Sequence, residues 1–246
     1  MGRAFEYRKA SKMARWDKMA KTFSKIGKDI ALAVKAGGSD PEANPALRRC
    51  ILNAKGANMP KDNVERAIKK ASGADAENYE EINYEGYGQG GVAFFVECTT
   101  NNTTRTVANV RAIFNKFDGN LGKNGELAFI FDRKGIFTID LAQIKMDWDD
   151  FEMEMIDGGA EDVEKDEDEV LITTAFEDFG SLSHKLDELK IEAKSAELQR
   201  IPNNSKEVSL EQFKINMKML ERFEDDDDVQ NVYHNMEMTD ELLETL

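Results

Sequence analysis

The chain has 246 residues and a formal net charge of −15, with 48 acidic and 33 basic residues. Its hydrophobic content of 41%, with 14 Phe, is sufficient for packed cores, which excludes a chain that is disordered throughout. The two cysteines, Cys50 and Cys98, lie far apart and do not indicate a disulfide framework, which favours a reducing compartment. No run of about 18 apolar residues is present, so the sequence predicts no membrane span.

Charge is divided sharply along the chain. Residues 1–73 contain 17 Lys and Arg against 7 Asp and Glu, whereas residues 74–246 contain 16 against 41. Such asymmetry predicts a nucleic-acid or membrane partner for the basic end. The start resembles an organelle transit peptide in charge, but that charge continues into predicted helices, and no apolar core of a secretory signal precedes them. We therefore expect a cytoplasmic protein.

Residues 1–16 form a predicted basic arm in which Phe5, Tyr7 and Trp16 are interleaved with cations. Cations bind phosphates, and aromatic rings stack on unpaired bases. The arm therefore supplies the first candidate contacts with nucleic acid. These candidates are Arg3, Arg8, Lys9, Lys12, Arg15 and Trp16.

Residues 17–78 are predicted to form a head domain of three helices. The first begins at Asp17, has apolar residues such as Ile26 and Ile30 at spacings of three and four, and ends at Gly37-Gly38. Asn44-Pro45 and Pro60 are typical openings of two further short helices. Lysines at the same spacing lie opposite the apolar positions of the first helix and form a predicted lysine stripe: Lys18, Lys21, Lys25, Lys28 and Lys35. The other candidate contacts of the head are Arg48, Arg49, Lys55 and Lys61.

The remaining sequence alternates strands with helices, so the predicted fold class is α+β and multidomain. Two ferredoxin-like domains are predicted, with residues 136–206 inserted into a split domain of residues 79–135 and 207–246. The order within the insertion, βαββαβ, is the ferredoxin-like signature. The predicted strands are 82–85, 92–98, 127–131, 136–139, 160–164, 170–173, 194–200 and 229–234. The predicted helices are 102–117, 148–156, 179–189 and 209–223.

Two motifs invite an anion-binding interpretation. The glycines of GYGQGG, residues 86–91, lead into a strand, whereas a dinucleotide-binding loop follows a strand and opens a helix, so a tight hairpin turn is favoured. The polar segment TTNNTTRTVANVR, residues 99–111, feeds a helix N-terminus, which offers N–H groups to an anion. Such a segment is more often an ordinary capped helix than an anion-binding site. Arg105 and Arg111 are therefore secondary candidate contacts.

The acidic run EDDDD, residues 224–228, lacks the spaced ligands of a calcium loop and is interpreted as a solvated turn or a surface that repels phosphate. His184 and His234 lie without a nucleophile pattern, and neither cysteine has the spacing of a metal ligand. The sequence therefore predicts no enzyme, no metal and no cofactor. For the basic end, nucleic acid is favoured over a membrane surface, an acidic protein partner or simple solubility, and the oligomeric state is left open.

Four long strings identify a resemblance that covers nearly the whole chain in order. They are GGSDPEANPALRRCILNAKGANMPKDNVERAIKKASG, NYEGYGQGGVAFFVE, TNNTTRTVANVRAIFNKFDGNLG and EDDDDVQNVYHN. Together they resemble the YebC family, which includes the mitochondrial translational activator of cytochrome c oxidase subunit one. Many relatives begin with a GHSKW-like segment, where this chain has GRAFEY.

The resemblance implies a three-domain α and α+β protein that is cytoplasmic in bacteria. Bacterial members are commonly labelled probable transcriptional regulatory proteins that bind DNA, and the label favours a DNA-binding regulator. Other members are associated with the ribosome and promote elongation through difficult stretches such as proline runs. A translation factor bound to ribosomal RNA is therefore the alternative, and the interleaved aromatics of the arm lean toward RNA.

Overall fold

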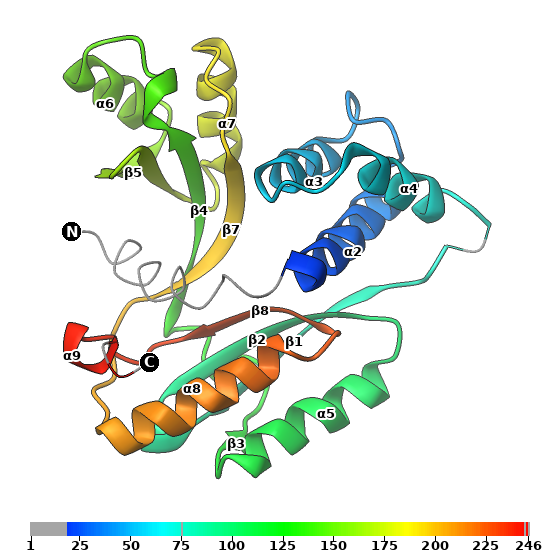
Figure 1. Cartoon of the computed structure of the whole chain (residues 1–246), viewed down its shortest axis with the longest axis vertical. Helices are drawn as coiled ribbons and strands as arrows, with labels where there is room; N and C mark the ends of the chain where they lie inside the picture. Colours follow the sequence, from blue (N-terminus) through cyan, green and yellow to red (C-terminus); the bar gives the residue numbers. More distant parts are fainter. Residues whose placement is uncertain (1–18, 75, 244, 246) are drawn as a thin grey trace. The chain divides into compact units, whose positions relative to one another are not determined.

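A computed structural model describes residues 19–74, 76–243 and 245 (Figure 1). The described residues form two compact units. One contains the residues up to Ala74 together with Arg133–Ile201, and the other contains the residues from 76 to Asp132 together with those from Pro202 onward. The chain thus leaves and re-enters each unit.

The first unit begins with three helices, α2 (Met19–Gly37), α3 (Pro45–Gly56) and α4 (Lys61–Ala71), which confirms the three-helix prediction. Their shared core is built from small and branched apolar side chains of all three helices: Ile26, Ile30, Ala33, Val34, Leu47, Cys50, Ala54 and Val64. Burial raises the pKa of the Cys50 thiol to about 12. This cysteine is therefore a core residue without thiolate character at neutral pH.

Asn44 joins α2 to α3. Its side chain accepts from the Leu47 N–H at 3.1 Å and so caps α3, as predicted. The same amide donates to the carbonyls of Ala33 and Gly38, each at 2.8 Å. Because Gly38 has a φ of +85°, the chain turns sharply after α2. One buried amide thereby fixes the angle between two helices.

The inserted segment of this unit contains β4 (Phe131–Asp140), α6 (Trp148–Asp157), β5 (Ala160–Asp166), β6 (Glu169–Ala175), α7 (Phe179–Glu188) and β7 (Ser195–Pro202). The sheet order is β5-β6-β4-β7, so the first and last strands are neighbours. This arrangement confirms the ferredoxin-like prediction for the insertion. Its core includes Phe137, Phe151 and Met155.

Helix α3 of the head docks on β7, the edge strand of this sheet. The Asn53 amide donates to the Ala196 carbonyl at 3.0 Å and accepts from the Ala196 N–H at 2.8 Å, so one side chain occupies the place of a neighbouring strand. Leu52 adds an apolar contact with the sheet's core. Gly56 packs so closely that a Cβ there would overlap the Lys194 carbonyl oxygen.

Replacing Gly56 with Ala is expected to force α3 away from β7 because the Lys194 oxygen is backbone and cannot move aside. Overpacking of this kind costs about 2 kcal/mol, which corresponds to roughly 30-fold faster hydrogen exchange at the Ala196 amide. Gly180→Ala is the matched control, since a Cβ at this exposed position of α7 meets nothing within 4 Å. Equal exchange at Ala196 in both variants would contradict the docking.

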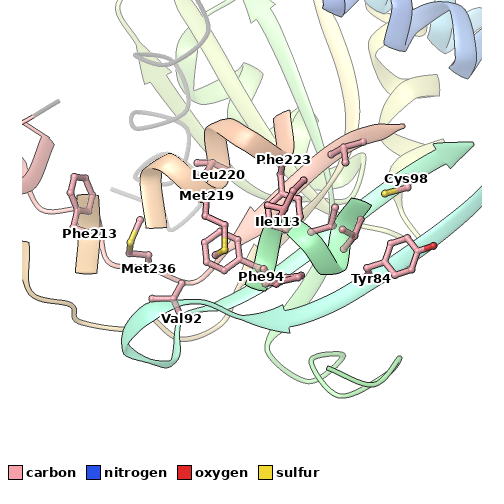
Figure 2. Packing of buried hydrophobic residues seen from close by; sticks show 14 residues of the cluster. Tyr84, Val92, Phe94, Cys98, Ile113, Phe213, Met219, Leu220, Phe223 and Met236 are labelled. Carbon is pink, nitrogen blue, oxygen red and sulfur yellow. The ribbon is translucent and has the colours of Figure 1, made fainter. Parts of the chain in front are cut away.

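The second unit contains β1 (Glu80–Tyr87), a 3-10 turn at Gln89–Gly91, β2 (Ala93–Thr100), α5 (Thr103–Lys116), β3 (Asn120–Leu121), α8 (Leu210–Glu224), β8 (Val229–His234) and α9 (Asp240–Leu243). Its sheet order is β3-β1-β2-β8. Helices α5 and α8 lie side by side on one face of the sheet (Figure 1). Between helices and sheet lies a core rich in Phe and Met, including Phe94, Phe213, Met219 and Phe223 (Figure 2).

The α+β, multidomain class is confirmed, but the second sheet differs from the ferredoxin-like order predicted for it. The GYGQGG segment joins β1 directly to β2 as an antiparallel hairpin, so two adjacent strands precede α5. The hairpin itself confirms the turn interpretation of these glycines, of which Gly90 and Gly91 have φ values of +71° and +75°. A ferredoxin-like unit would have a helix between its first two strands.

The predicted strand at 127–131 is also wrong, because residues 124–130 form turns and the strand begins at Phe131. The cause is Glu85, a buried residue of β1. Its carboxylate accepts from the backbone N–H groups of Gly125 and Leu127. These donors are therefore not available for a strand ladder.

Candidate nucleic-acid interface

Helix α2 has the two-sided character that the sequence predicts. Ile26, Ile30 and Val34 are buried in the head core. At 100° per residue, Lys21, Lys25, Lys28 and Lys35 lie on the opposite side of the helix. Lys35 is exposed and the other three are half-buried. Within this stripe, Lys18 lies outside the described residues, as do the arm candidates Arg3, Arg8, Lys9, Lys12, Arg15 and Trp16.

The candidate cations of α3 have partners within the first unit. Arg48 is exposed and donates to the carbonyls of Pro41 and Glu42 at 2.9 and 2.7 Å. The Arg49 guanidinium lies 5.7 Å from the centre of the Phe179 ring. Lys55 forms an ion pair with Glu192. These three residues therefore support the loop before α3 and the docking of α3.

Helix α4 adds cations that the sequence reasoning did not select. Lys61, which it did select, lies 3.6 Å from Glu65 in an exposed pair that contributes little to stability. Arg66, Lys69 and Lys70 are also exposed on this helix. Their signal was present in the sequence as the run ERAIKK, whose cations outnumber its single acid.

Arg105 and Arg111 lie on α5 in the second unit. Arg111 is exposed. The Arg105 guanidinium binds the Asp228 carboxylate, with Nη2 at 2.8 Å from Oδ2 and 2.9 Å from Oδ1. This contact raises the pKa of Arg105 further, chiefly through the hydrogen bond. The charge of Arg105 is therefore balanced by an acid of the same chain.

A carboxylate of the same chain, that of Asp228, lies at the start of α5. Asn102 caps the helix by accepting from the Arg105 N–H at 3.0 Å. The Thr106 hydroxyl lies 2.9 Å from the Asp228 carboxylate, whose side chain is only 6% exposed. Asp228 thus occupies the electropositive helix start that the sequence offered to an external ligand. Nothing in the acidic run distinguishes this residue from its neighbours, so sequence reasoning missed it.

Among the residues that the structure describes, no group of three His, Cys, Asp or Glu side chains is placed to hold a metal ion. Within the same residues, no helix has the length and apolar character needed to cross a bilayer.

Comparisons with known proteins cover the whole of this arrangement. Residues 3–74 match the family model of the TACO1/YebC N-terminal domain, and residues 79–236 match that of the TACO1/YebC second and third domain. A probable transcriptional regulatory protein of Bacteroides fragilis is 55% identical over 241 residues, which are 98% of each chain. One of Porphyromonas gingivalis is 52% identical over 236 residues, 96% of this chain and 97% of its own.

A solved structure agrees with the sequence comparisons. The crystal structure of a conserved hypothetical protein from Aquifex aeolicus superposes with a TM-score of 0.78 at 36% identity. The match covers 92% of this chain and 93% of the other. Fold and sequence coincide over nearly the full length, and the chain belongs to the TACO1/YebC family.

Proposed function

We propose that the protein is a non-enzymatic, nucleic-acid-binding regulator of gene expression that acts in the cytoplasm. The observation that carries the proposal is the polarity of α2, which buries one apolar side and presents a row of lysines on the other. This helix belongs to a segment with 17 basic and 7 acidic residues in a chain whose net charge is −15. Lysine contacts with phosphates supply most of the affinity that is independent of base sequence.

DNA is the primary proposed target. Close relatives carry the name probable transcriptional regulatory protein, and a regulator of transcription acts through DNA. A strongly acidic remainder restricts phosphate contact to the basic surfaces, because like charges repel across water at short range. The proposed contacts are the lysine stripe of α2, the exposed cations of α3 and α4, and the basic arm.

Ribosomal RNA is the second candidate target, in a translation factor that assists elongation. The composition of the arm favours it, because Phe5, Tyr7 and Trp16 alternate with cations, and aromatic rings stack on splayed bases. Crosslinking in cells followed by sequencing of the bound nucleic acid separates the two. Discrete promoter DNA would support the regulator and contradict the translation factor, and predominantly ribosomal RNA would do the reverse.

Replacing Lys21, Lys25 and Lys28 together with Gln is expected to weaken binding to a DNA duplex and to flatten its salt dependence. Each lost phosphate contact removes about 0.9 from the slope of log affinity against log salt, so three contacts remove about two to three. Fluorescence anisotropy at several salt concentrations measures this slope. Gln is a good helix former, so α2 is expected to remain folded.

A scattered control separates a specific contact from a change in total charge. Lys123, Lys145 and Lys206 are exposed and lie outside the helices of both units, and their joint replacement with Gln removes the same three charges. The scattered control is expected to keep the wild-type slope. If the α2 variant also keeps it, the lysine stripe does not contact phosphate.

A further inference from the structure

The second unit separates its charges between helices and sheet. Residues 75–132 and 202–246 contain 8 Lys and Arg against 21 Asp and Glu. Six of the eight cations lie on α5 and α8, whereas these two helices contain only three of the acids. The helical layer is thus a basic surface on a strongly acidic unit.

All six cations are exposed. Among the described residues, no ion-pair partner is found for five of them, whereas Arg105 binds Asp228. We call these five the helical basic face: Arg111 and Lys116 on α5, and Lys214, Lys218 and Arg222 on α8. Glu211 and Glu221 lie three positions from Lys214 and Lys218 on α8, but neither forms an ion pair with them among the described residues, so the charge of these cations is available to a ligand from solution.

The three cations of α8 form a linear array. They recur every four residues, which places them on one side of the helix at intervals of about 6 Å. Helix α8 is held firmly beneath them, since Phe213 and Phe223 are fully buried and Ser209 forms a capping box with Gln212. A fixed row of charges suits an extended polyanion better than a single phosphate group.

Helix α5 runs antiparallel to α8 and extends this face sideways. Asn109 donates to Asp226 beyond the end of α8 at 3.1 Å. At the other end, the Gln89 amide contacts the Phe117 carbonyl at 3.3 Å, and the Gln89 backbone N–H donates to Asn216 of α8 at 2.9 Å. Helix α5 contains no acidic residue, so its cations add to the positive charge of the helical layer.

The opposite face of the sheet has the reverse charge. Strands β1, β2 and β8 contain four glutamates and no Lys or Arg. Glu81 and Glu97 point away from the helices, since Tyr84 and Val96 beside them lie in the core. Glu85 is on the same side but is buried, with its carboxylate bound to backbone N–H groups. An anionic ligand is therefore repelled from the sheet and attracted to the helices.

The helical basic face also lacks the features of a protein-binding surface. Protein interfaces depend on exposed aromatic or large apolar anchors. Among the described residues, the only large exposed apolar side chain on α5 or α8 is Leu210, at the first position of α8. Phosphate contacts require no such anchor.

We infer that the helical basic face is a second contact for the phosphate backbone of a double-stranded nucleic acid, separate from the head. The inference rests on the proposed function, which makes nucleic acid the ligand of this protein. It adds a surface that neither the basic arm nor the lysine stripe includes. Two phosphate-binding surfaces on one chain increase the number of counterions released on binding.

The test compares three variants of the full chain with wild type on a short DNA duplex and on an RNA duplex of the same sequence. The face variant replaces Lys214, Lys218 and Arg222 with Gln. It is compared with the variant of Lys21, Lys25 and Lys28 and with the scattered control. The slope of log affinity against log salt is expected to fall by about two to three units in the face variant and to stay unchanged in the scattered control. Circular dichroism checks that each variant is folded.

Each outcome has a defined meaning. A wild-type slope in the face variant, with a reduced slope in the α2 variant, overturns the inference and leaves the proposed function intact. If neither variant changes the slope, both the inference and the role of the head are wrong. If the face variant loses binding to a polyglutamate peptide but keeps duplex binding, the face takes an acidic protein and the inference is again overturned.

Discussion

Replacing Asp228 with Asn is expected to lower the free energy of unfolding by about 2 kcal/mol, because a buried side chain loses its charge-assisted hydrogen bonds. The Asp228 carboxylate is 6% exposed and binds the Arg105 guanidinium and the Thr106 hydroxyl. Arg105 is 49% exposed, so water compensates for part of the loss on its side. The expected loss is therefore that of hydrogen bonds to one buried charged group, and not that of a fully buried ion pair. Denaturant unfolding monitored by circular dichroism measures the change.

Asp227→Asn is the matched control for this prediction. Asp227 belongs to the same acidic run but is exposed, and exposed substitutions usually change stability by less than about 0.5 kcal/mol. A double-mutant cycle between Asp228 and Arg105 tests the partner directly and is expected to give non-additive effects of the two changes. Additive effects of the two changes would show that Asp228 stabilises the unit through other contacts.

The stability of the second unit is expected to fall as the pH decreases from about 6.5 to about 4, because His234 resists protonation in the folded state. Burial lowers the pKa of His234 from 6.5 to about 4. Its ring lies 5.8 Å from that of Phe94, and its Nδ1 accepts from the Met236 N–H at 3.2 Å. The neutral imidazole therefore belongs to the folded core.

The direction of the pH dependence follows from proton binding in the two states. Between pH 6.5 and 4 the unfolded chain protonates His234 and the folded chain does not, so acid favours unfolding. The stabilisation is complete above pH 6.5, is lost progressively on the way down to pH 4, and does not change further below that. The two pKa values correspond to about 3 kcal/mol.

His234→Asn isolates this contribution, since the Asn oxygen can accept from the Met236 N–H but does not titrate. The difference in unfolding free energy between wild type and variant is expected to vary by about 3 kcal/mol across this pH range. His184→Asn, at an exposed position of α7, provides the control. A wild-type-minus-variant difference that is constant with pH would contradict the assignment.

Asp228 and His234 are both buried, and each holds elements of the second unit together. Asp228 ties the start of α5 to the start of β8, and His234 ends β8 against the aromatic core. Both lie in the segment EDDDDVQNVYH, residues 224–234. This segment therefore stabilises the second unit in addition to contributing negative charge.

Elements with strong local signals were predictable from the amino-acid sequence. Helix α3 begins at Pro45 and β8 spans Val229–His234, as predicted, because an Asn-Pro cap and a short run with β-branched and aromatic residues act within a few residues. The two sides of α2 were also predictable, since helical periodicity alone separates Ile30 from the lysines. The ferredoxin-like order of the insertion followed from the sequence of its elements.

The partners of polar residues that lie far apart along the chain became known from the folded structure. Asn53 meets Ala196 across 143 positions, Arg105 meets Asp228 across 123, and Glu85 binds the backbone of Gly125 across 40. Because of these contacts, the charge of Arg105 is balanced by Asp228, and residues 124–130 form turns where a strand was predicted. Sequence patterns report burial and periodicity, whereas a side-chain hydrogen bond depends on distances that only the folded chain sets.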